Sequence, residues 1–162
     1  MVDLDERDDR PTRLLNDDPS SWFTWDTDAQ WWEAVSFAWS MQHNPSTRLD
    51  VWWEIFGSDR PDREAMMTVP ERTVWSRLPE VVTLYRGGSG PLALGMSWTL
   101  RPHIALFFAG RCREIWGGRP WMFTAEVSRE HVVAVLLERH EVEALVLPKH
   151  VEVQWEKTGW LT

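Results

Sequence analysis

Arg86 is a residue whose type and position could support chemistry, because it follows the apolar run of residues 81–85 and precedes Gly87. An arginine is costly to bury without an anion, and its planar guanidinium group can hold a phosphate through two parallel hydrogen bonds. A glycine beside it would let a ligand approach the backbone closely. Arg86 is therefore a candidate anion-binding residue, and a structural salt bridge to a carboxylate is the alternative.

A second polar segment, Ser97-Trp98-Thr99, lies eleven residues after Arg86. Side chains alternate between the two faces of a strand, so Ser97 and Thr99 would share one face while Trp98 packs into the core. The two hydroxyl groups could bind a ribose or brace a carboxylate. The alternative is that they are ordinary small polar residues on a half-exposed strand.

The third segment, Glu141-Val142-Glu143, precedes the apolar run of residues 144–147. Strand alternation predicts that both carboxylates lie on one face and Val142 on the other. Such a pair could divide its work: one carboxylate stabilises a cationic sugar in the transition state, and the other orients an incoming nucleophile. A charged strand edge or turn is the alternative.

In this order the three segments resemble the arginine–serine–glutamate clade of mono-ADP-ribosyltransferases, the cholera-toxin-like group. The resemblance extends over roughly residues 80–155, and Ser97-Trp98-Thr99 runs into an expected helix with small and aromatic residues, as in the family. In this chain the expected helices precede Arg86, whereas better-known members carry helices between the arginine and the serine. The matching stretches are residues 81–87, 95–100, 105–109 and 141–148.

The resemblance implies a role for each matching residue. Arg86 would contact the phosphate and nicotinamide-ribose region of NAD, and Gly87 would let the nicotinamide amide reach backbone groups. Ser97 would brace the catalytic glutamate. Glu143 would be this glutamate, and it would bond the ribose 2′-hydroxyl as the glycosidic bond breaks. Glu141 matches the first glutamate of the family's Glu-x-Glu pair, which goes with an arginine or another guanidine-like group as the acceptor of ADP-ribose.

The predicted NAD-binding set also includes three residues of the second segment and the helix after it. Thr99 closes the hydroxyl triplet, and Trp98 and Phe107 are expected beside the cofactor. The histidines show no metal-ligand spacing and Cys112 is the chain's single cysteine, so no metal site is predicted.

The predicted activity is NAD-dependent transfer of ADP-ribose to a macromolecular acceptor, with release of nicotinamide and NAD as the co-substrate. An arginine or another guanidine-like group is the favoured acceptor, and a protein is favoured over a nucleic acid. Two alternatives stay open. Water could be the acceptor, which would make the protein an NAD glycohydrolase, or an inactive domain of this kind could act as a binding or inhibitor module.

Charge and composition limit the classes of partner. The formal net charge of −8 argues against a surface built for nucleic-acid phosphates, because such surfaces cluster lysine and arginine. A single cysteine excludes an intrachain disulfide and fits the cytoplasm. We expect no signal peptide and no membrane span. Most of the 13 tryptophans are expected in the core.

The elements that must position these residues follow from the hydrophobic pattern. We expect residues 1–20 to form an acidic, flexible leader, with a docking segment for a basic partner as the alternative. Residues 21–162 are expected to form a single domain, helical over 21–78 and strand-rich over 79–162. This segregation predicts an α+β fold. The resemblance implies that the N-terminal helices pack on a mostly antiparallel, two-sheet ADP-ribosyltransferase-like core. The expected helices are 28–41, capped by Asp28, and 49–57, 70–78 and 101–113; the expected strands are 81–85, 94–99, 121–127, 132–137, 144–147 and 151–155, with a loop over 87–91.

Overall fold

The structure of the protein is a computed structural model that describes residues 25–41, 49–89, 95–137 and 141–156. The chain divides into two compact units, Met1–Thr68 and Val69–Thr162, here named the helical unit and the sheet unit. The predicted leader, residues 1–20, lies outside the described residues. Among the described residues, no helix combines the length and the apolar character that crossing a membrane requires.

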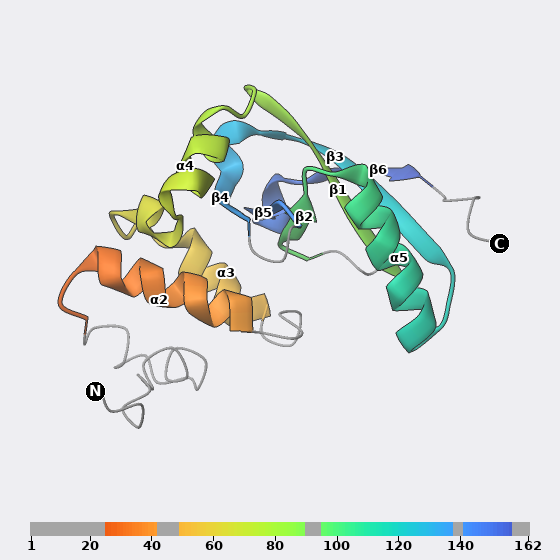
Figure 1. The fold of residues 1–162 in the computed structure, drawn as a ribbon, viewed down its shortest axis with the longest axis horizontal. Helices are drawn as coiled ribbons and strands as arrows, with labels where there is room; N and C mark the ends of the chain where they lie inside the picture. The colour runs from red at the N-terminus through yellow and green to blue at the C-terminus, as the bar shows by residue number, and fades with distance from the viewer. Residues whose placement is uncertain (1–24, 42–48, 90–94, 138–140, 157–162) are drawn as a thin grey trace. The chain divides into compact units, whose positions relative to one another are not determined.

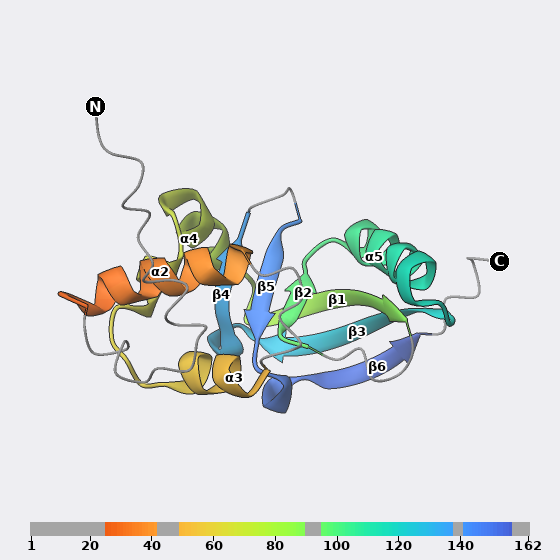
Figure 2. The ribbon, with the colours of Figure 1, turned by 90° about the horizontal axis from the view of Figure 1, so that it is seen from below.

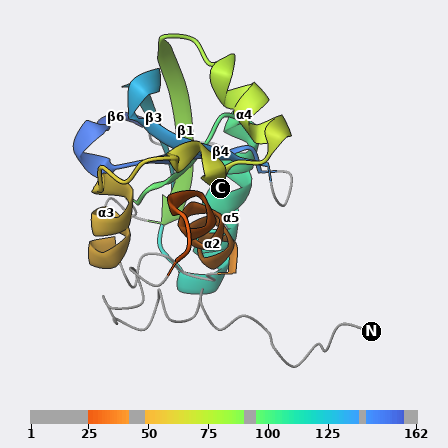
Figure 3. The same cartoon turned by 90° about the vertical axis from the view of Figure 1, so that its left-hand side faces the viewer.

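The helical unit contains α2 (Asp28–Met41), α3 (Leu49–Gly57) and the 3-10 helix η3 (Arg63–Met66). Figure 3 views α2 nearly along its axis, with α3 beside it. The two helices meet through aromatic rings: the centroid of Trp39 lies 5.0 Å from that of Trp52 and 5.4 Å from that of Phe56. Large aromatic side chains supply much buried area, so a short pair of helices gains a core of its own.

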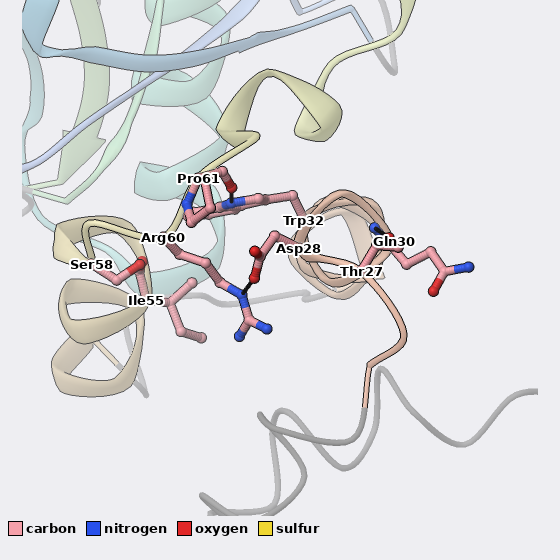
Figure 4. A network of polar contacts seen from close by, with 8 residues as sticks. All are labelled: Thr27, Asp28, Gln30, Trp32, Ile55, Ser58, Arg60 and Pro61. Carbon is pink, nitrogen blue, oxygen red and sulfur yellow. Dashed lines mark hydrogen bonds and ion pairs between the residues drawn. The ribbon is translucent and has the colours of Figure 1, made fainter.

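The start of α2 differs from the predicted cap. The hydroxyl of Thr27 accepts a hydrogen bond from the amide of Gln30 at 3.2 Å, so Thr27 rather than Asp28 caps the helix. Asp28 instead accepts a 2.5 Å hydrogen bond from Nε of Arg60, as Figure 4 shows. The indole of Trp32 donates to the carbonyl of Pro61 at 2.8 Å in the same network.

The sheet unit builds one antiparallel sheet of six strands in the order β4-β5-β2-β1-β3-β6 (Figure 1). The α+β class is thereby confirmed, whereas the predicted second sheet is not: the described strands all belong to one sheet. The elements are α4 (Val69–Ser76), β1 (Val81–Ser89), β2 (Ser97–Thr99), α5 (Pro102–Trp116), β3 (Pro120–Ser128), η4 (Arg129–His131), β4 (Val132–Leu136), β5 (Glu143–Val146), η6 (Pro148–His150) and β6 (Glu152–Glu156).

The sheet is strongly twisted, and its two faces are covered by different helices. In Figure 2, β4 and β5 run across the direction of β1, β3 and β6, and α5 lies along β1. The opposite face carries the apolar core, which includes Leu84, Trp98 and Phe123. Leu78 belongs to this core, and Trp75 of α4 packs against it. A continuous core on one face and a helix on the other hold the strands in fixed register.

Two boundaries differ from the sequence-based expectation for physical reasons. β1 continues through Gly87 to Ser89, where a loop was expected, because these residues pair with Met122, Trp121 and Pro120 of β3. α4 was grouped with the helical front half, yet it belongs to the sheet unit. The sequence shows that α4 is a helix but does not show what it packs against.

Candidate functional site

The three polar segments lie on three neighbouring strands of the sheet. β2 lies between β1 and β5, and Thr99 pairs with Tyr85 on one side and with Glu143 on the other. Ser97 pairs with Leu145 of β5. Directly paired residues of antiparallel strands project to the same face, so the side chains of Ser97, Thr99 and Glu143 share a face, as predicted for the first two.

Arg86 reaches the same strand by a different route. Its neighbour Tyr85 is paired with Thr99, so strand alternation sends the Arg86 side chain toward the opposite face, where its partner Phe123 lies. The guanidinium group then turns back onto the start of β2, where Nη1 donates to the carbonyl oxygen of Ser97. Tyr85 and Thr99 are the registered pair between β1 and β2, and the Arg86 bond extends the contact between these strands beyond it.

Gly95 makes room for this guanidinium group. A Cβ atom at Gly95 would lie 2.8 Å from Nη2 of Arg86 and 3.2 Å from its Cζ. Gly95 is itself buried, so its lack of a side chain decides where the arginine rests. The sequence pattern placed Gly95 within the expected strand 94–99 but indicated no contact between this glycine and Arg86.

The charge of Arg86 is coupled to Glu143. Burial lowers the pKa of the Arg86 guanidinium, and the carboxylate of Glu143 opposes this effect by raising it. An arginine remains protonated even under such a shift, so the pair is a cation and a carboxylate close enough for their charges to interact. Each residue as a whole is half-buried, although the guanidinium group of Arg86 is the part that burial affects most.

The hydroxyl group of Thr99 is committed to the backbone rather than to a ligand. It donates to the carbonyl oxygen of Glu141 at 2.6 Å and accepts from the amide of Arg101 at 3.1 Å. Thr99 is 6% exposed, which leaves little surface for a cofactor. Thr99 thus has a structural role, because it ties the residues before β5 to β2, and its predicted contact with NAD stays a prediction.

The sequence predicted that strand alternation would place Glu141 and Glu143 on one face, but the structure does not have them on one strand. β5 begins at Glu143, and Glu141 precedes it outside the strand. Val142 between them has a φ of 46°, in the left-handed region that a β-branched residue rarely enters. Its carbonyl accepts a 3.2 Å hydrogen bond from the amide of Leu100, which helps to hold this conformation. Such strain costs about 1–3 kcal/mol and concentrates at functional sites.

Gly87 has a packing reason for being a glycine. A Cβ atom there would lie 1.8 Å from the carbonyl oxygen of Ala105 and 2.5 Å from the amide nitrogen of Ala109, both in α5. The backbones of β1 and α5 therefore meet directly at this residue. The predicted contact of Gly87 with the nicotinamide stays a prediction.

Two residues of the predicted NAD-binding set lie elsewhere. Trp98 is 2% exposed in the core, and its indole nitrogen donates to the carbonyl of Gly95 at 3.1 Å. Phe107 is 58% exposed and lies two residues from both Ala105 and Ala109, which places it on the outer face of α5. Neither ring is brought to the site, because one is needed for the core and the other faces away.

Cys112 of α5 lies near Arg86 without the character of a nucleophile. Burial raises the pKa of its thiol, and the nearby charges of Arg86 and Arg111 only partly offset this effect. A protonated thiol is a poor nucleophile. Within the described parts of the chain, no group of three or more His, Cys, Asp or Glu side chains is arranged to hold a metal ion.

Comparison with known proteins assigns no function to these residues. The chain matches no protein-family model, and no curated protein or solved structure is similar to it. The function must therefore be argued from the residues themselves.

Proposed function

We propose that the protein is an NAD-dependent mono-ADP-ribosyltransferase with an ADP-ribosyltransferase-like core, acting in the cytoplasm. The observation that carries the proposal is that Arg86, Ser97 and Glu143 lie on three neighbouring strands, β1, β2 and β5, with Arg86 and Glu143 close enough for their charges to interact. A cation to bind a dinucleotide phosphate beside a carboxylate to stabilise a sugar cation is the pair of groups that this reaction needs.

The partial exposure of the four proposed catalytic residues fits a site that admits a ligand. Arg86, Ser97, Glu141 and Glu143 are all half-buried, neither packed away in the core nor free in solvent. Nη1 of Arg86 donates to the Ser97 carbonyl. The planar guanidinium group could exchange such a contact for a phosphate, which it can bind through two parallel hydrogen bonds. NAD would be held there as the co-substrate.

The reaction would proceed by loss of nicotinamide before the acceptor attacks. Glu143 would stabilise the cationic ribose that forms as the glycosidic bond breaks. Glu141, held outside β5 by the strained Val142, would orient the acceptor group. The favoured acceptor is a guanidine group on a protein, because a second carboxylate can bind it through two hydrogen bonds.

The variant Glu143→Gln tests the first half of this proposal. It keeps the size of the side chain but removes the negative charge, so nicotinamide release from NAD should fall by about 100-fold or more, as loss of one stabilising group costs in other enzymes. Release can be followed by chromatography, with circular dichroism as the control for folding. Unchanged release in a folded variant would exclude the assignment.

The variant Glu141→Gln tests the acceptor role separately. Transfer to agmatine, a small guanidine compound, should fall more than nicotinamide release without agmatine, because water needs no guanidine-binding carboxylate. An equal loss of both activities would argue against a distinct acceptor role. Nicotinamide release without transfer to any added guanidine or protein in the wild type would favour an NAD glycohydrolase.

A further inference from the structure

Helix α4 binds both ends of the edge strand β4 through two side chains one turn apart. Oε1 of Glu71 accepts a 2.7 Å hydrogen bond from the amide of Leu137, directly after β4. The indole nitrogen of Trp75 donates to the carbonyl of Val132, the first residue of β4, at 3.0 Å. β4 ends the sheet, and an edge strand turns a row of backbone groups outward that need partners.

Glu71 is unusual for a surface helix because it is buried. It is 5% exposed, although charged residues are rarely buried this far unless they are paired. Its bond to Leu137 joins residues 66 positions apart in the chain. The buried Glu71 side chain holds the backbone amide that it binds, because releasing Leu137 would break this hydrogen bond.

Leu137 begins the connection from β4 to β5, which leads to Glu141. The start of this connection is held by Glu71 and its end by Thr99, whose hydroxyl binds the carbonyl of Glu141. Residues 138–140 between these anchors lie outside the described residues. Two buried polar side chains from two other elements therefore fix the two ends of one short connection.

The two glutamates depend on this connection to different degrees. Glu143 is paired in the sheet with Leu136 of β4 and Thr99 of β2, so its backbone is fixed on both sides. Glu141 lies outside the strand, so no ladder pairing fixes its backbone, and its contacts include the hydrogen bond from Thr99. A change at the start of the connection should therefore reach Glu141 before it reaches Glu143.

We propose that Glu71 is a positioning residue for Glu141: by anchoring the Leu137 amide it sets where the acceptor-binding carboxylate lies. The catalytic consequence rests on the proposed function, while the anchoring itself does not. Glu71 touches neither NAD nor acceptor in this proposal, and it acts through the backbone of the β4–β5 connection.

The test compares Glu71→Met with Glu71→Gln, using NAD with and without agmatine. Methionine fills the space but cannot accept the Leu137 hydrogen bond, so the ratio of ADP-ribose transfer to nicotinamide release should fall about tenfold, as expected for a small misplacement of a reacting group. Glutamine retains an acceptor oxygen and should restore the ratio to within about twofold of the wild type. Failure of glutamine to restore it would overturn the proposal.

Trp75→Phe is the matched control, because it removes one hydrogen bond from the same helix at the other end of the same strand. It should lower stability as Glu71→Met does but leave the ratio of transfer to release unchanged. Equal shifts in both variants would show that Glu71 acts only through stability. If Glu71→Met does not fold, Glu71→Asp takes its place. Aspartate keeps the carboxylate but withdraws it by one methylene, so the ratio of transfer to release should fall, though by less than is expected for Glu71→Met.

Amide hydrogen exchange separates this inference from the proposed function. In Glu71→Met the amide of Leu137 and the peptide from Leu137 to Glu143 should exchange faster than in the wild type, and in Trp75→Phe they should not. Unchanged exchange in Glu71→Met would overturn the anchoring whatever the catalytic result. Faster exchange in a protein that releases no nicotinamide would uphold the anchoring and exclude the proposed function.

Discussion

Two glycines shape the surroundings of Arg86, and they do so for different reasons. Gly87 lets the backbone of α5 approach β1, so a side chain there would collide with backbone atoms that cannot move easily. Gly95 faces the end of the Arg86 side chain, which is flexible and would give way. A substitution at Gly87 therefore threatens the fold, whereas one at Gly95 displaces a single functional group.

Gly95→Ala should move the Arg86 guanidinium group away from the Ser97 carbonyl and break the hydrogen bond to that half-buried acceptor. The free energy of unfolding should fall by about 1–3 kcal/mol, measured by urea denaturation. If Arg86 binds NAD, the KM for NAD should also rise.

Gly110→Ala in α5 is the control for this variant. Nothing lies within 4 Å of a Cβ atom at Gly110, so this substitution should be neutral or stabilise the helix by up to about 1 kcal/mol. A Gly95→Ala variant with the stability and KM of the wild type would mean that the guanidinium group does not rest against Gly95.

At the scale of elements, two 3-10 helices meet through a pair of histidine rings. His131 of η4 and His150 of η6 are stacked with centroids 3.9 Å apart and planes 8° apart. Nε2 of His131 lies 3.8 Å from a carboxylate oxygen of Glu130. Burial lowers the pKa of His150, and the neighbouring His131 and Lys149 lower it further, against a smaller opposite effect of Glu130.

This pKa shift predicts how the stability of the protein depends on pH. Because folding lowers the pKa of His150, the unfolded chain binds the proton more readily as pH falls through the ordinary histidine range near about 6.5. The ionisation of His150 therefore leaves the free energy of unfolding unchanged above this pH range and lowers it below this range. The free energy of unfolding should be measured between about pH 8 and 5 in the wild type and in His150→Gln. The glutamine variant should lose less stability on acidification, and parallel curves would contradict the assignment.

At the scale of the whole molecule, the two units have separate cores. Aromatic side chains of α2 and α3 fill the core of the helical unit, whereas the core of the sheet unit is built from residues of the strands and of the segment around α4. Each unit therefore has the apolar contacts that a cooperative transition requires.

Residues 69–162 produced alone should consequently fold. The expected result is a single cooperative thermal transition, with near-ultraviolet circular dichroism from the tryptophans of the sheet unit. Full-length protein carrying Trp52→Ala in the helical unit is the complementary measurement: it should lose the contacts of Trp52 with Trp39 and Phe56 while the transition of the sheet unit persists. A fragment without a cooperative transition would show that the sheet unit needs the remainder of the chain.

The periodicity of the sequence determined the types and approximate places of the elements. Short runs of apolar residues indicated the strands around β1 and β5, and Gly117 and Gly118, both with positive φ, end α5 where the sequence breaks its helical pattern. Local signals suffice for such features because they arise within a few residues of chain. The order of Arg86, Ser97 and Glu143 along the chain was likewise readable, and their strands prove to be neighbours.

Tertiary structure alone decided which polar groups reach the site. Strand alternation predicted one face for Glu141 and Glu143, but the left-handed Val142 breaks that alternation, and its conformation depends on Leu100 and Thr99 from another strand. The role of Glu71 depends on Leu137, which is far away in the chain. The role of Gly95 depends on where the guanidinium group of Arg86 lies. A sequence specifies where residues alternate, but contacts between distant segments decide which of them meet, because that choice is made by packing and by the need to satisfy buried polar groups.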